Sequence, residues 1–342
     1  MDRAAVNRAL EKGKGLGTGI DKKNWHLEKL KHTIQQPGII LPYLERALLK
    51  RAVDNASDRD QSFLHASEMA KNDWCERSSW YRIMKFPIEK DDKYSFNLQR
   101  IFEEGHDIHN KFQTWAWDAG ILEGVWKCLI PWCRHGWYGI SPHECPQCGY
   151  DLIEYKEVPL YNEKYHIIGH ADGIINIDGW RALWEIKSLG ARTLQFENPN
   201  LYKQYEDGEI TLNDMWVRTR TPLPSHRRQG ILYSTLTGIT KVHYIYEWKP
   251  NQQVKEFQTV VRHGDADDLL ARALSVAQGL ERKLPPTRPQ WASPTHNVCN
   301  KCPYQNECWT GEADAQDQQQ EERPVATLTA GQRTQRIRRR VR

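Results

Sequence analysis

The 342-residue sequence has no apolar run long enough to cross a bilayer, and its start, Met1-Asp2-Arg3, lacks the basic-then-apolar layout of a signal peptide. It also lacks a strong net charge. The formal value is +4, so any nucleic-acid binding would have to come from local basic patches. Hydrophobic residues make up 39% of the chain, as in a rather polar globular protein. We therefore expect a cytoplasmic protein with no membrane partner.

Cysteine, by contrast, occurs eight times. In a reducing compartment, clustered cysteines favour metal binding over disulfides. Four of them fall within residues 126–150 as a Cys-x4-Cys pair and a Cys-x2-Cys pair, a spacing that predicts an inserted zinc ribbon. Its ligands would be Cys128, Cys133, Cys145 and Cys148. His135 and His143 are alternatives to Cys128, and redox chemistry is the other interpretation of a Cys-x2-Cys pair.

Two apolar runs in the middle of the chain predict neighbouring strands at 165–177 and 181–188. Asp178-Gly179 between them is a strong hairpin signal. Asp172 lies on the first of these strands, and Glu185 and Lys187 lie on the second. Two carboxylates and a lysine on adjacent strands suit a divalent cation and an activated water. From these residues alone, two ordinary acids in a solvated hairpin is an equally good interpretation.

Helical periodicity would bring further polar side chains toward these strands. A helix near 98–117 would present His109 on its inward face, four residues after Gly105. The apolar residues of that face would be Leu98, Ile101, Phe102, Ile108, Phe112 and Trp115. A second helix would run from Ser225, its expected N-cap, to about Thr237. The polar residues on one face of this second helix are Gln229 and Tyr233.

Other segments give weaker signals. A helix over 67–82 would carry Cys75, and a lone cysteine on a helix is more often buried structure than a ligand. The further expected elements are strands at 151–161 and 240–248, a helix at 266–284, and a loop or short-helix excursion at 190–225. Residues 1–64 are expected to form a helical basic N-terminal arm and residues 312–342 a disordered basic tail.

Four short motifs follow one another along the chain: Gly105-x3-His109, Asp172, Glu185-x-Lys187 and Gln229-x3-Tyr233. Each is weak alone, but their order resembles the RecB-like branch of the PD-(D/E)XK nuclease superfamily. The remaining cysteines, Cys75, Cys299, Cys302 and Cys308, flank this set as in the iron–sulfur subgroup, which includes the AddB nuclease domain and the CRISPR-associated RecB-like exonucleases. The resemblance covers roughly residues 65–310.

The resemblance implies an α/β fold, an α+β mixed sheet flanked by helices, with a restriction-endonuclease-like core into which the zinc ribbon is inserted. It implies that Mg²⁺ or Mn²⁺ is bound by His109, Asp172, Glu185 and the carbonyl oxygen of Ile186. Lys187 would orient or deprotonate the attacking water, and Gln229 and Tyr233 would position the lysine and the substrate strand. The flanking cysteines would hold a [4Fe-4S] cluster, and a zinc ion is the alternative occupant of the same four thiolates.

Two features depart from the superfamily pattern. Ala171 precedes Asp172 where the name motif has proline, and the cysteines of 126–150 form an insertion that the core does not require. We expect a metal-dependent DNA nuclease, bacterial or phage-encoded, acting as an exonuclease on single-stranded or end-bearing DNA in recombination, repair or phage DNA metabolism. Its partners would be DNA and a helicase, recombinase or other DNA-processing protein. The alternative is a DNA-end-binding or assembly factor with weak or partner-dependent cleavage.

Overall fold

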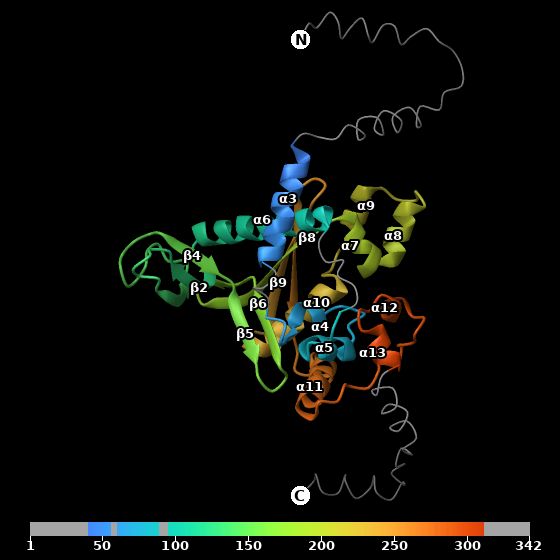
Figure 1. Cartoon of the computed structure of the whole chain (residues 1–342). Coiled ribbons are helices and arrows are strands. Elements are labelled where there is room, and N and C mark those ends of the chain that lie inside the picture. Colours follow the sequence, from blue (N-terminus) through green and yellow to red (C-terminus); the bar gives the residue numbers. More distant parts are fainter. Residues whose placement is uncertain (1–39, 56–59, 89–94, 311–342) are drawn as a thin grey trace, which may run out of the picture. The chain divides into compact units, whose positions relative to one another are not determined.

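The computed structural model describes residues 40–55, 60–88 and 95–310 (Figure 1). The chain divides into two units, residues 1–54 and 55–342. Helix α3 (Leu41–Asn55) is the described part of the first unit. Most of the predicted basic arm and the whole of the predicted tail at 312–342 lie outside the described residues. No helix in the described ranges is long and apolar enough to cross a membrane.

A seven-stranded mixed sheet is the centre of the second unit. Its order is β10-β9-β8-β7-β2-β3, with β4 also paired to β2. The strands are β2 (Leu122–Cys128), β3 (Gly136–Ile140), β4 (Ile153–Lys156), β7 (Gly173–Ile177), β8 (Trp180–Leu189), β9 (Lys241–Trp248) and β10 (Gln253–Val260). The β8–β9 pair is parallel and the others are antiparallel. The predicted α/β class, a mixed sheet flanked by helices, is confirmed.

Two helices cover opposite faces of this sheet. Along β8, Trp184 and Ile186 belong to the core under α6 (Phe96–Asp118), whereas Leu183 and Leu189 belong to the core under α10 (Pro224–Thr237). Because side chains alternate along a strand, Glu185 and Lys187 project to the α10 side.

A smaller sheet of order β1-β6-β5 forces a correction to two predicted strands. Its strands are β1 (Leu64–His65), β5 (Val158–Asn162) and β6 (Ile167–Ala171). The predicted strand 165–177 is divided into β6 and β7, because Ala171 pairs with Val158 in the small sheet while Gly173 pairs with Trp184 in the large one. The predicted strand 151–161 is divided in the same way into β4 and β5. Asp172 lies at the point where the chain changes sheets.

The predicted hairpin between β7 and β8 is confirmed. Asp178 and Gly179 both have positive φ, 50° and 85°, and Ile177 pairs with Trp180. Two consecutive left-handed residues are what a two-residue type I′ turn needs, and Asp-Gly supplies them at low cost. This turn sets the β7–β8 register, in which Gly173 pairs with Trp184, so that Asp172 and Glu185 lie at the same end of the pair.

The helix predicted over 67–82 is wrong. The chain forms α4 (Ala66–Met69), then a turn, then α5 (Glu76–Ile83), with Cys75 as the extended N-cap of α5. Turn-forming Asn72 and Asp73 interrupt the apolar periodicity there. α10 also starts earlier than predicted: Leu223 rather than Ser225 is its N-cap, because Pro224 occupies the first helical position, which proline favours. Its predicted end at about Thr237 is confirmed, and Gly238 follows as the left-handed C-cap (φ 76°).

The predicted inward face of α6 is only partly right. Ile108 and Phe112 are buried, but Trp115 and the apolar residues of the first turns are exposed, since the buried residues of α6 are confined to its second half. These exposed residues are Leu98, Ile101, Phe102 and Trp115. The apolar stripe is thus longer than the part of the sheet that it covers.

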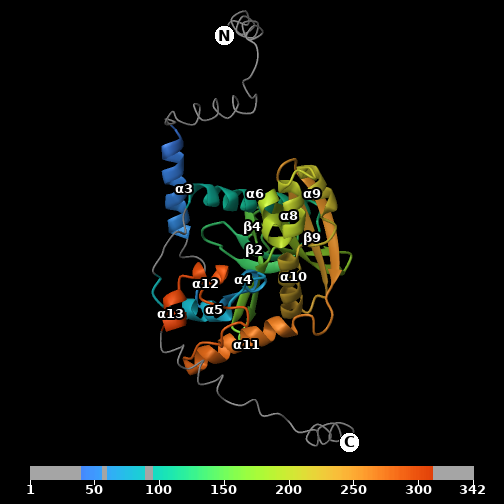
Figure 2. The ribbon, with the colours of Figure 1, turned by 90° about the vertical axis from the view of Figure 1, so that its right-hand side faces the viewer.

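The remaining helices surround the α10 side of the sheet and the C-terminal end of the described chain. Residues 190–225 form short helices, as one of the two expected alternatives, and the predicted helix 266–284 is α11. The helices are α7 (Ala191–Glu197), α8 (Pro199–Glu206), α9 (Leu212–Arg218), α11 (Asp267–Arg282), α12 (Asn297–Asn300) and α13 (Gln305–Thr310). Figure 2 shows α12 and α13 beside α5.

Gly230 is the residue that lets α10 approach β9, and its replacement by alanine is expected to be strongly destabilising. A Cβ at this position would lie 2.1 Å from the Tyr244 hydroxyl oxygen and 3.0 Å from Val242 Cγ1. We expect a loss of about 1–3 kcal/mol in the free energy of unfolding, measured by urea denaturation. Gly105→Ala is the control, because its Cβ would meet only Ser188 Oγ at 4.0 Å. Equal stability of the two variants would contradict the tight helix–sheet contact.

Candidate active site

His109, Asp172 and a residue that the sequence did not indicate, Glu157, converge at the change of sheets. One ring nitrogen of His109 and one carboxylate oxygen each of Glu157 and Asp172 all lie within 4.8 Å of one another. Glu157 lies between β4 and β5, where the chain also passes from the large sheet to the small one. An imidazole and two carboxylates are ligands that divalent cations accept. Sequence analysis missed Glu157 because this residue falls inside the predicted strand 151–161, where no motif marked it.

Asp172 is held through both its side chain and its backbone. Its Oδ1 lies 3.3 Å from His109 Nδ1, and its Oδ2 accepts the Ile186 N–H at 2.6 Å. Its carbonyl oxygen accepts hydrogen bonds from Gln113 Nε2 at 2.9 Å and from the Tyr155 hydroxyl at 3.1 Å. Gln113 and Tyr155 are therefore positioning residues that no motif indicated. The carboxylate is left with little freedom to rotate.

Glu185 and Lys187 form a buried pair beside Asp172. Lys187 Nζ donates to Glu185 Oε2 at 2.7 Å and lies 3.9 Å from Asp172 Oδ2. The Glu185 side chain is fully buried, and its Oε1 has no hydrogen-bond partner among the described residues. A buried carboxylate oxygen without a partner is costly unless something occupies it. This oxygen fits a cation ligand, although Glu185 lies outside the close group of His109, Glu157 and Asp172.

The pKa shifts reflect the crowding of negative charge. Burial would raise the pKa of Asp172, but Lys187 and His109 hold it below its ordinary value. Burial, with the charge of Asp172, raises the pKa of Glu157 to about 7. Burial also raises the pKa of Glu185, against the pull of Lys187. Burial would lower the pKa of Lys187, yet Glu185 and Asp172 raise it above its ordinary value and keep the amine charged. A further cation would relieve the repulsion between these carboxylates.

Gln229 and Tyr233 reach the same region from α10, as their spacing indicated. Gln229 Nε2 donates to the Tyr233 hydroxyl oxygen at 3.0 Å. Burial raises the pKa of Tyr233 well above its ordinary value, and the nearby charge of Glu185 adds to this. Gly169 in β6 leaves space for the ring, since a Cβ there would lie 2.8 Å from Tyr233 Cε1. The Ile186 carbonyl as a metal ligand stays a prediction.

The four cysteines of the 126–150 insertion come together in a geometry that fits zinc. Their sulfur atoms all lie within 4.8 Å of one another, with Cys128 and Cys148 at 3.6 Å and Cys133 and Cys145 at 3.8 Å. Four thiolates around a tetrahedral zinc at a Zn–S distance of about 2.3 Å would be roughly 3.8 Å apart. His135 and His143 do not belong to this group; His135 stacks on Trp137.

The other four cysteines line one cavity of about 220 Å³ between α5 and the segment of α12 and α13. These are Cys75, Cys299, Cys302 and Cys308. In the described part of the chain, no three of their sulfur atoms lie within 4.8 Å of one another, which is wider than one zinc ion would hold them. Arg77 and Arg288 also line the cavity, and their charge suits an anionic group. A larger thiolate-bound cluster fits this donor set.

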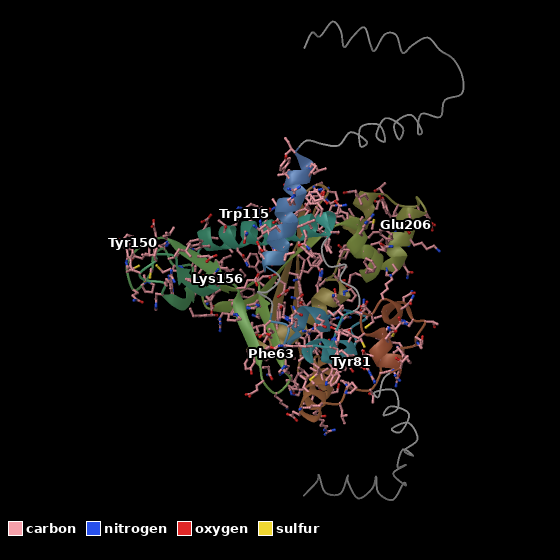
Figure 3. The ribbon with its side chains drawn as sticks, viewed as in Figure 1. Phe63, Tyr81, Trp115, Tyr150, Lys156 and Glu206 are labelled. Carbon is pink, nitrogen blue, oxygen red and sulfur yellow. The ribbon has the colours of Figure 1, made fainter. Side chains whose placement is uncertain are left out.

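The two cysteine sites lie far apart. In Figure 3, Tyr150 marks the tip of the 126–150 insertion at the left, and Tyr81, which lines the cavity of the other four cysteines, lies toward the opposite side. Neither cysteine set includes a residue of the His109, Glu157 and Asp172 group. Each cysteine set is therefore suited to fastening its own segment without taking part in the carboxylate group.

Comparison with known proteins gave weak structural similarities. No protein-family model and no curated protein matches the chain. Among solved structures, SSO0001 is 13% identical, with a TM-score of 0.37 over 78% of this chain and 94% of that chain. The alkaline exonuclease LHK-Exo from Laribacter hongkongensis is 11% identical, with a TM-score of 0.37 over 65% of this chain and 89% of that chain. LHK-Exo in complex with dAMP is likewise 11% identical over the same shares, with a TM-score of 0.36.

Proposed function

We propose that the chain is a nuclease that hydrolyses DNA phosphodiester bonds with Mg²⁺ or Mn²⁺. The observation that carries the proposal is the convergence on Asp172, whose two carboxylate oxygens meet His109 on one side and the Ile186 N–H and Lys187 on the other. Around it lie a buried carboxylate with an open oxygen, Glu185, and a third carboxylate, Glu157. This donor set would hold the cation, with Glu157 joining the residues that the sequence indicated.

The chain's own side chains have separable tasks in such a reaction. A bound divalent cation supplies acidity to water and offsets charge on the phosphate. His109, Asp172 and Glu185 would bind it, with Glu157 as a further ligand. Lys187 stays protonated because its carboxylate neighbours raise its pKa, and its side chain is 14% exposed. This favours Lys187 as a donor that orients water or phosphate over Lys187 as a base.

The helix α10 would complete the substrate side of the site. Gln229 and Tyr233, joined by their hydrogen bond, would hold the lysine and the DNA strand in place. The cysteines of the insertion would carry structural zinc, and the cavity cysteines a [4Fe-4S] cluster that fastens the C-terminal segment to α5. An exonuclease acting on single strands or duplex ends, together with a helicase or recombinase, is the activity that the sequence resemblance favours.

A degradation assay tests the proposal. Single-stranded, duplex and circular DNA, labelled at either end where ends exist, would be incubated with the full chain in Mg²⁺, Mn²⁺ or chelator. We expect metal-dependent loss of linear DNA and resistance of closed circles. Tight binding of DNA ends without cleavage under any metal would favour the assembly-factor alternative instead.

A further inference from the structure

A histidine that no motif singled out lies on α10 beside the proposed active site. His226 is one turn before Gln229, and its ring packs edge-on against Tyr246 of β9 with the centroids 5.3 Å apart. Tyr246 is the register partner of Lys187 in the parallel β8–β9 pair. Partners in such a pair project to the same face, so His226 packs directly over the neighbour of Lys187.

Hydrogen bonding fixes which ring nitrogen of His226 carries the proton. The Leu223 N–H donates to the Tyr246 hydroxyl oxygen at 2.8 Å, and His226 Nδ1 lies 2.6 Å from the same oxygen. Within the described chain, Nδ1 is the only acceptor in reach of the Tyr246 hydroxyl proton. Tyr246 therefore donates to Nδ1, and a neutral imidazole must then carry its hydrogen on Nε2.

The surroundings keep this imidazole neutral and close to the reacting groups. Burial, together with the charge of Lys187, lowers the pKa of His226 to about 3. Asp172 is also near enough to act on its pKa. The residue as a whole is partly exposed to solvent, and its Nε2 is not among the buried side-chain nitrogens of the described residues that lack a partner, so the Nε2–H remains able to meet a bound molecule. Tyr246, by contrast, is fully buried.

We propose that the His226 Nε2–H donates a hydrogen bond to a non-bridging oxygen of the phosphate that is cleaved beside Lys187. A neutral donor suits this place because it adds a hydrogen bond without placing a second positive charge next to the lysine. The two successive hydrogen bonds, from the Leu223 N–H to Tyr246 and from Tyr246 to His226 Nδ1, hold the imidazole in one orientation. This inference rests on the proposed nuclease function and adds a substrate-contacting residue to it.

The test compares two replacements of His226. His226→Phe keeps a flat ring but removes the donor, and we expect cleavage in Mn²⁺ to slow by about 10- to 100-fold, the loss of one hydrogen bond to a charged group. His226→Gln offers an amide N–H at a similar reach, and we expect it to stay within about 5-fold of wild type. His243→Phe on β9 is the control, since His243 Nδ1 contacts Glu256 and not the site.

A sulfur-substituted substrate separates a phosphate contact from a merely structural effect. Wild type should cleave one phosphorothioate diastereomer of the scissile linkage more slowly than the other, and His226→Phe should lose most of this difference. Tyr246→Phe removes the hydroxyl that fixes the His226 tautomer, and this variant should lose part of the difference between the diastereomers. If His226→Phe does not fold, His226→Gln and Tyr246→Phe decide through the same substrates. Unchanged rates and unchanged diastereomer preference in active protein would overturn this inference alone, whereas inactive wild type would overturn the nuclease function.

Discussion

Replacing Lys187 by alanine is expected to slow DNA cleavage by about 10²–10⁴-fold, the range for loss of a group that acts on the proton or charge of the transition state. Lys187 is the cation that contacts both Glu185 and Asp172. Without it, the water and phosphate lose their donor, and two buried carboxylates lose their partner. Single-turnover cleavage of end-labelled DNA in Mn²⁺ measures the effect.

A matched control variant and a second replacement of Lys187 keep this result interpretable. Lys164→Ala removes an exposed lysine whose ammonium lies over the Tyr165 ring, away from the carboxylates, and should cleave at the wild-type rate. Burial already raises the pKa of Glu185, so protonation of Glu185 can limit the destabilisation in Lys187→Ala. If that variant still unfolds, Lys187→Gln keeps the length and the hydrogen bond but removes the charge. Wild-type cleavage by either folded variant would exclude Lys187 from the site.

Local chemistry made part of this site visible in the sequence. The Asp178-Gly179 turn could be recognised because few dipeptides tolerate two left-handed residues in succession. Gln229 and Tyr233 share a face because helical spacing is rigid, and their hydrogen bond follows from it. The Cys-x2-Cys pair likewise predicts a close thiolate pair from chain geometry alone. In each case the relevant contacts lie within a few residues of one another.

The residues that sequence analysis missed depend on contacts between distant segments. Glu157 approaches Asp172 because the chain changes sheets twice, between β4 and β5 and again between β6 and β7, and an apolar run does not show such a break. Gln113 and Tyr155 bind the Asp172 carbonyl from α6 and β4, contacts that no periodicity encodes. For the first half of α6, sequence analysis predicted burial that the structure does not show. An apolar stripe on a helix does not indicate how far the sheet beneath it extends.

Replacing the cysteines that line the cavity beside α5 is expected to have the other large effect. Anaerobically prepared protein should be brown and contain about four iron atoms and one zinc ion per chain. Cys302→Ser should lose the iron but keep the zinc, and Cys148→Ser should do the opposite. Colourless wild type holding two zinc ions would show that zinc fills both sites. Metal analysis and visible absorbance measure these outcomes.

Loss of the iron should also weaken the distant active site, through a chain of contacts that starts at Cys75. Cross-links that close long loops contribute about 3–5 kcal/mol, and a cluster joining Cys75 to Cys299, Cys302 and Cys308 would close a very long one. The turn before Cys75 is bound to α10, where Arg228 donates to the Ala70 carbonyl and to Asn72 Oδ1, each at 2.6 Å. Arg228 directly precedes Gln229.

Cys302→Ser is therefore expected to unfold at a lower urea concentration than Cys148→Ser and to cleave DNA more slowly. Arg228→Ala should reproduce the slower cleavage while retaining the iron, because it breaks the connection to α10 and leaves the cysteines in place. Arg192→Ala, an exposed arginine of α7, serves as its control. Full activity in iron-free, folded Cys302→Ser would show that the cavity cysteines hold the C-terminal segment without influencing α10.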